Sequence, residues 1–221
     1  MAIIVNGINI PTNGDYIKVG NTIVDKVICN GVTVWEKKKD EFTGSELVVS
    51  LGGMVDTSGR TSFSDNWFSY NLGSSGSTYG FIVDKVTADA DDGAGNWFTP
   101  AARIVNPIDV TGYSKIEITT YRDLEIETDD DPDEGEYGWY NTYVLYRENS
   151  PINERFWDDE SEEWYEDWDG VSEMLSSPGT VTKTITPGTT KVYLGIRINT
   201  KCAVEKTGAI FGFSKIKLIK R

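Results

Sequence analysis

Branched apolar residues alternate with turn-forming residues over the first forty positions. Residues 3–10 read IIVNGINI and residues 27–34 read VICNGVTV, so Asn6-Gly7 and Asn30-Gly31 each separate two β-branched runs. A two-residue type I′ turn needs positive φ at both central positions, which Asn tolerates and Gly adopts freely. The second stretch continues into Trp35. The pattern predicts a hairpin module over residues 1–39, too short to bury a core of its own.

Beyond the polar stretch 37–41, the pattern remains that of short strands and turns. Branched or alternating runs, at 80–83, 108–119, 140–146, 180–198 and 211–219, are separated by segments rich in Gly, Ser and Asp. Helical periodicity is sparse, and strands at this spacing are typical of a sandwich or barrel. We therefore expect an all-β protein in which the N-terminal β-hairpin module is followed by a jelly-roll-like β-sandwich over residues 44–221.

The charge of the chain is unevenly distributed. The net charge is −14 over 221 residues, but residues 123–173 contain 20 acidic residues and two arginines, a balance of −18, which leaves +4 for the remainder. No basic stretch is interleaved with aromatic residues on the scale that nucleic-acid binding needs. We therefore expect neither DNA nor RNA as a partner.

Residue types that the chain lacks restrict its chemistry. There is no histidine, which removes the commonest general base and transition-metal ligand. Cys29 and Cys202 match no metal-binding spacing and are expected to be free thiols, with a disulfide as the alternative.

No run approaches the roughly 18–20 apolar residues of a membrane span, and residues 1–5 lack the charged start of a signal peptide. Synthesis in a cytoplasm is the simplest expectation.

One loop resembles a calcium-binding segment in part. Asp89, Asp91 and Asp92 precede Gly93, and carboxylates are the ligands that Ca²⁺ prefers. The position where an EF-hand loop would carry its last glutamate is Pro100. A Ca²⁺ site and a solvated turn both remain open, and no other cofactor is expected.

Aromatic and acidic residues are mixed between residues 156 and 168. Trp157, Trp164, Tyr165 and Trp168 lie among many carboxylates, and the tryptophan spacing would place them on one face of a helix. One interpretation is structural, a short amphipathic helix or a loop over a sheet. The other is a recognition surface, because aromatic rings stack on sugars and anchor protein interfaces. The same surface would suit a basic protein partner.

Two features resemble known proteins. The segment DKVICNGVTVWEK, residues 25–37, resembles N-terminal segments of tail, baseplate and fibre proteins of tailed bacteriophages, in which a short NG-x-x-VW hairpin recurs. The segments IDVTGYSKIEIT, VYLGIRI and FSKIKLI resemble strands of a carbohydrate-binding-module-type jelly roll. In that fold the strand with the Thr-Gly-Tyr turn is central, and the final strand pairs near the N-terminal edge. The resemblance implies a fold without fixing a function.

These observations lead to one expected function and two alternatives. We expect a non-enzymatic structural component of a tailed-phage virion, with Asn6, Gly7, Asn30, Gly31 and Trp35 in its attachment module. It would assemble with other virion proteins as a homo-oligomer, decorate the particle or adhere to a cell-surface glycan. A carbohydrate-binding module is the main alternative. A histidine-free glycosidase is a further one, since glycoside hydrolysis needs only two suitably spaced carboxyl groups.

Overall fold

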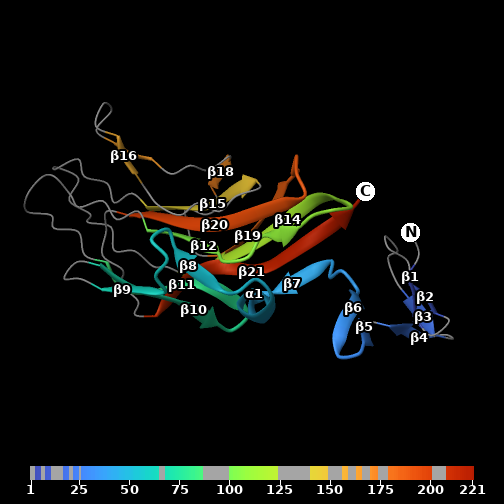
Figure 1. Ribbon diagram of the computed structural model, residues 1–221. Coiled ribbons are helices and arrows are strands. Elements are labelled where there is room, and N and C mark those ends of the chain that lie inside the picture. Colours follow the sequence, from blue (N-terminus) through green and yellow to red (C-terminus); the bar gives the residue numbers. More distant parts are fainter. Residues whose placement is uncertain are drawn as a thin grey trace, which may run out of the picture. The chain divides into compact units, whose positions relative to one another are not determined.

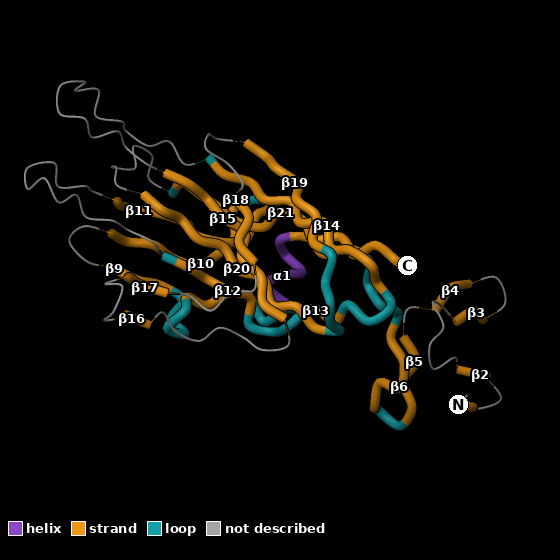
Figure 2. The backbone as a smooth tube through the Cα atoms, turned by 90° about the horizontal axis from the view of Figure 1, so that it is seen from above, coloured by secondary structure: helices purple, strands orange, loops and turns teal. Residues whose placement is uncertain are grey.

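A computed structural model of the chain describes residues 3–5, 8–10, 17–19, 22–24, 26–64, 68–86, 100–123, 140–148, 156–158, 163–165, 170–173, 179–200 and 208–221. The chain divides into two compact units, residues 1–40 and residues 41–221. Strands dominate both units, as Figure 2 shows, and one short helix is present among the described residues. The prediction of an all-β protein is confirmed.

The first unit consists of three antiparallel strand pairs. They are β1 (Ile3–Val5) with β2 (Ile8–Ile10), β3 (Ile17–Val19) with β4 (Thr22–Val24), and β5 (Lys26–Cys29) with β6 (Val32–Glu36). Asn30 and Gly31 connect β5 to β6 with φ of 51° and 80°, as a type I′ turn requires. Each pair forms a sheet of two strands among the described residues, an arrangement that is marginally stable by itself in water.

The second unit is a β-sandwich of two antiparallel sheets (Figure 1). The first sheet contains β7 (Glu41–Thr43), β9 (Ser62–Ser64), β10 (Phe68–Ser75), β11 (Thr78–Val86), β14 (Tyr113–Arg122), β19 (Gly179–Ile185) and β21 (Ala209–Lys220). The second contains β8 (Met54–Asp56), β12 (Ala101–Ile104), β13 (Ile108–Asp109), β15 (Tyr140–Glu148), β18 (Gly170–Glu173) and β20 (Lys191–Thr200). Helix α1 (Gly44–Ser50) and the separate pair β16 (Phe156–Asp158) and β17 (Glu163–Tyr165) complete the described elements.

The strand order interleaves the two sheets of the sandwich. Neighbouring strands follow β11-β21-β14-β19 in one sheet and β12-β20-β15-β18 in the other. The chain therefore crosses repeatedly between the sheets, from β14 to β15 and from β19 through β20 to β21. This interleaving places consecutive segments of the chain on opposite sides of one core. Most backbone pairing consequently joins segments that are distant in sequence.

Alternation along each strand divides its side chains between the core and the outer faces. On β14 the buried residues include Ile116 and Ile118, whereas Glu117 and Thr119 are only partly buried. The core cluster draws on both sheets and includes Phe81, Phe211, Phe213, Ile104, Leu194 and Ile196. Leu47 of α1 joins this core and is fully buried. The interior between the two sheets is thus mainly apolar, although Thr120, Arg122 and Thr142 are fully buried as well.

The sandwich begins slightly earlier than the sequence indicated. Strand β7 pairs with residues 215–217 of β21, and Lys215 Nζ lies 2.8 Å from a carboxylate oxygen of Glu41. Residues 41–43 therefore belong to the sandwich, which the sequence placed at residues 44–221. The last strand lies beside the first strand of its domain, and β14 lies between β19 and β21, one strand in from the edge of the sheet.

Candidate functional site

The aromatic-acidic segment has a different local structure from the helix that its spacing suggested. Trp157 of β16 lies opposite Trp164 of β17, and Phe156 lies opposite Tyr165, in an antiparallel pair. The helical alternative is therefore wrong, because paired strands cannot have the 3.6-residue repeat that would align these residues. Trp168 lies outside the described residues.

Only some of the residues assigned to the attachment module lie in the described part of the structure. Asn30 and Gly31 form the predicted turn, and half-buried Trp35 lies opposite Val27. Asn6 and Gly7 lie outside the described residues, while the flanking strands pair Val5 with Ile8. Cys29 is a free, partly buried thiol, and Cys202 is outside the described part.

The proposed calcium ligands Asp89, Asp91 and Asp92 also lie outside the described residues, so the Ca²⁺ site stays a prediction. Within the described ranges, no three carboxylate or thiol side chains come close enough together to hold a metal ion. No helix in this part of the chain is long and apolar enough to cross a membrane.

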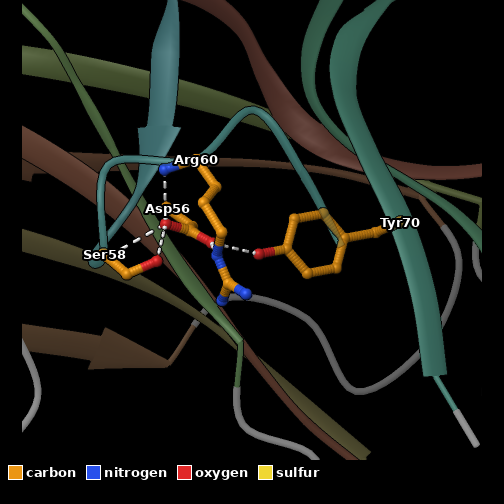
Figure 3. A network of polar contacts seen from close by, with 4 residues as sticks. All are labelled: Asp56, Ser58, Arg60 and Tyr70. Atoms are coloured by element: carbon orange, nitrogen blue, oxygen red, sulfur yellow. Dashed lines mark hydrogen bonds and ion pairs between the residues drawn. The ribbon is translucent and has the colours of Figure 1, made fainter. Parts of the chain in front are cut away.

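A buried carboxylate organises the turn that follows β8 (Figure 3). Oδ1 of Asp56 accepts hydrogen bonds from the backbone N–H of Ser58 at 2.9 Å, the Ser58 hydroxyl at 2.7 Å and the backbone N–H of Arg60 at 2.8 Å. Oδ2 accepts from Arg60 Nε at 2.8 Å and from the Tyr70 hydroxyl at 2.7 Å. Since Asp56 belongs to the second sheet and Tyr70 to the first, this carboxylate joins the two sheets.

Burial and hydrogen bonding together set the pKa values of Asp56 and Tyr70. Burial alone would raise the pKa of Asp56, but the hydrogen bonds from Ser58, Tyr70 and the Arg60 backbone, together with the Arg60 charge, lower it overall. Burial, and then the bond to the Asp56 carboxylate, raise the pKa of the Tyr70 phenol. The arrangement keeps a carboxylate and a neutral phenol in fixed roles. It suits a structural clamp better than a group that exchanges protons near neutral pH.

The depressed pKa of Asp56 predicts a specific pH dependence of stability. A carboxylate that is more acidic in the folded state stabilises the fold above its unfolded-state pKa, close to the ordinary value of 3.8, and loses this effect as pH falls through the folded-state value. The difference in unfolding free energy between the native chain and Asp56→Asn should therefore be constant from pH 7 to about 5 and shrink below about pH 4. Denaturant titrations at several pH values measure it. A difference that stays unchanged down to pH 2 would contradict the assigned shift.

A second polar cluster lies on the outer face of the second sheet. We define the arginine–tyrosine face as Arg103, Tyr143, Arg147, Tyr193 and Arg197. Residues directly opposite each other in an antiparallel pair share a face, and Arg197 lies opposite Tyr143 while Arg147 lies opposite Tyr193. Arg103 lies opposite Gly195, two positions from both Tyr193 and Arg197, and so faces the same way.

The pairing between β15 and β20 is reciprocal. Tyr143 precedes Arg147 by four positions, and Tyr193 precedes Arg197 by the same number. Because the strands are antiparallel, each tyrosine lies opposite the arginine of the other strand. The guanidinium carbon of Arg197 lies 4.7 Å from the centroid of the Tyr143 ring, within cation–π range. The Tyr143 ring therefore helps to hold the Arg197 guanidinium group against the sheet.

The face is partly withdrawn from water. Arg103, Tyr143, Arg147, Tyr193 and Arg197 are all partly buried, and Leu145, between Tyr143 and Arg147 on the same side, is fully buried. Burial lowers the pKa of the Arg103 guanidinium from its ordinary value, and the nearby Tyr193 oxygen partly opposes that shift. Charged groups in such surroundings interact more strongly with an anion than they would in bulk water.

This face was not found by reasoning from the sequence. The available signal was the repeated Tyr-x-x-x-Arg spacing, in YVLYR at 143–147 and YLGIR at 193–197. Its meaning depends on which strands are neighbours, which the sequence did not specify.

The comparison with protein-family models and the comparison with curated proteins found no match for this chain.

Proposed function

We propose that the chain is a non-enzymatic structural component of a tailed-phage virion. The N-terminal unit attaches it to the particle, and the jelly-roll-like sandwich is displayed for assembly, decoration or adhesion to a host-surface glycan. The observation that carries this proposal is the division into a small hairpin unit, residues 1–40, and a large sandwich, residues 41–221. Two-stranded sheets need further packing to be stable, which attachment to a partner would provide.

The β5–β6 hairpin has the surface that attachment needs. Ile28 is 59% exposed and Val32 is 64% exposed, one on each strand. Neither β5 nor β6 pairs with a third strand among the described residues. Open strand edges beside apolar side chains are what a partner uses when it adds a strand to a sheet. Other virion proteins, including further copies of this chain, are the partners that fit the proposal.

The test is whether this hairpin is needed for incorporation into the particle. Phage carrying the double substitution Ile28→Asp and Val32→Asp should assemble with at least tenfold less of this chain per particle, because two charges would be buried at the interface. Quantitative mass spectrometry of purified particles measures the copy number. Val49→Asp is the control, since Val49 is 81% exposed but belongs to the sandwich. Absence of the unsubstituted chain from particles would refute the proposal.

A carbohydrate-binding module that acts outside a particle is the second candidate. The arginine–tyrosine face favours it, because both residue types are common in recognition surfaces. In that case the chain would be missing from particles, and the Ile28→Asp/Val32→Asp variant would bind a glycan as well as the native chain does. Absence from particles is not expected of an attached virion component, whereas glycan binding by this variant is compatible with both functions.

A further inference from the structure

The turn of the β5–β6 hairpin contains a chemically labile linkage. Asn30 and Gly31 are both exposed, and a Cβ built on Gly31 would meet no atom within 4 Å. Water and hydroxide therefore reach the Asn30 side-chain amide and the Gly31 backbone nitrogen. Asparagine is thermolabile because the next backbone nitrogen can attack its amide carbon, and a glycine at that position has no side chain to obstruct the attack.

Asn-Gly pairs are confined to the N-terminal unit. The sequence contains three of them, at 6–7, 13–14 and 30–31, and none in residues 41–221. The first two pairs lie outside the described residues, so the geometry of the third carries the argument. The labile linkage is thus concentrated in the unit assigned to attachment.

The closed turn holds the reacting atoms apart. Asn30 and Gly31 have φ of 51° and 80°. In a type I′ turn the first central residue has ψ of about +30°. At that ψ the Gly31 nitrogen points away from the Asn30 side chain, whereas the attack needs both on the same side of the Asn30 Cα–C bond. The hairpin therefore has to open before the reaction occurs.

Little strand pairing holds the hairpin closed. Four residue pairs join β5 to β6, and their register shifts between Val27 and Ile28. Neither strand pairs with a third among the described residues, and a two-stranded sheet is marginally stable by itself in water. Such a segment opens locally without unfolding of the whole protein. A partner bound to the closed hairpin lowers the population of the open form by mass action.

We propose that Asn30-Gly31 is a site of spontaneous isoaspartate formation, which proceeds through the open hairpin and removes the turn that attachment requires. The consequence for attachment rests on the proposed function, whereas the reaction itself does not. A chain that stays unattached loses its hairpin with time, and an attached chain keeps it.

The reaction needs only water as a co-reactant. The Gly31 backbone nitrogen loses its proton to hydroxide and forms a bond to Cγ of Asn30, while the Cγ–Nδ2 bond breaks and the side-chain nitrogen leaves as ammonia with a proton from water. One water molecule then opens the succinimide ring, its hydroxyl adding to a ring carbonyl carbon and its hydrogen going to the ring nitrogen. Opening at Cγ gives aspartate. Opening at the backbone carbonyl gives isoaspartate, whose longer main chain cannot form a two-residue type I′ turn.

Peptide mapping by mass spectrometry of the purified full chain, incubated at mildly alkaline pH, tests the proposal. Asn30 should be converted roughly tenfold faster than Asn71, an exposed asparagine of β10 that precedes Leu72 and belongs to the larger sheet. Urea at concentrations that open the hairpin should accelerate the conversion of Asn30, because the rate follows the population of the open form. Chromatography of the peptides separates isoaspartate from aspartate.

Asn30→Gly is the matched control. Glycine adopts the positive φ of this position and has no side-chain amide, so the variant keeps the turn and forms no succinimide there. After the same incubation, NMR contacts between Val27 and Trp35 should be lost in the modified native chain and retained in Asn30→Gly. Particles that lack the chain should take up the incubated native chain less than the incubated variant. Both chains keep the other two Asn-Gly pairs, so the difference reports residue 30 alone.

Several results would overturn the inference. They are equal conversion of Asn30 and Asn71, a conversion rate of Asn30 that urea leaves unchanged, and Val27–Trp35 contacts that persist in chains with isoaspartate at position 30. Equal uptake of the two incubated chains would contradict the link to attachment. The rate comparison uses the native chain alone, so it holds whether or not the variant folds. Absence of the fresh native chain from particles would refute the proposed function and leave the reaction standing.

Discussion

Alanine at Gly212 is expected to destabilise the sandwich by roughly 3 kcal/mol or more, a large part of the stability of an ordinary domain. Gly212 of β21 lies opposite Gly80 of β11. A Cβ atom built on Gly212 would collide with the backbone carbonyl of Tyr79, and one on Gly80 would collide with the backbone of Phe211 and Gly212. Because these obstacles are backbone atoms within paired strands, no side-chain rotation relieves them.

The neighbouring strand offers a matched control. Gly73 of β10 lies opposite Gly80 in the same row, but a Cβ there would meet only the end of the Ile82 side chain, at 3.3 Å. Gly73→Ala should therefore change the unfolding free energy by less than about 1 kcal/mol. Urea denaturation of both variants provides the comparison. Similar stabilities for Gly212→Ala and Gly73→Ala would show that β11 and β21 do not pack as closely as described.

Removal of the buried carboxylate should have an effect of comparable size. Asp56→Ala is expected to cost about 3–5 kcal/mol of unfolding free energy, because buried donors on the turn and on Tyr70 would lose their acceptor. The side chain of Asp56 is 4% exposed and that of Arg60 is 52% exposed, so most of the cost comes from the buried donors rather than from the ion pair. Tyr70→Phe should cost about 1.5–3 kcal/mol by losing one bond to a charged group.

A double-mutant cycle isolates the bond between the sheets. If the Tyr70–Asp56 bond accounts for much of the effect, the double variant should be less destabilised than the two single effects added together. Asp109→Ala is the control, because its carboxylate accepts from the Thr111 backbone in a similar turn that is exposed to solvent. Its expected cost is about 0.5–1.5 kcal/mol. Equal losses for Asp56→Ala and Asp109→Ala would contradict a special role for the buried clamp.

Neither of these two buried features was visible in the sequence. The segment Asp56-Thr57-Ser58-Gly59 is an ordinary turn sequence, and nothing in it distinguishes Asp56 from the exposed Asp109. Likewise the chain contains 22 glycines, and only the pairing of β11 with β21 shows that Gly80 and Gly212 need to lack a side chain. Burial and close backbone approach arise when distant segments meet, so local sequence does not report them.

Some residues of the candidate sites were visible in the sequence, whereas others are brought together only by the fold. Sequence reasoning favoured the tryptophans at 157, 164 and 168, because aromatic clusters within one short segment are visible without knowing the fold. The arginine–tyrosine face is assembled from residues 103, 143–147 and 193–197, which are far apart along the chain. Each strand contributes an unremarkable alternation, and the cluster exists only through the register between strands.

By itself the sequence determined part of the local conformation of this protein, although it suggested a helix where β16 and β17 are strands. The turn at Asn30-Gly31 follows from the positive φ that these residues tolerate, and the alternation at 113–122 follows from the two-residue period of a half-buried strand. The tertiary structure decided the rest: which strands pair, which carboxylate is buried and which side chains share a face. These depend on contacts between segments up to a hundred or more residues apart, where the free energy of packing the core, rather than any local preference, selects the arrangement.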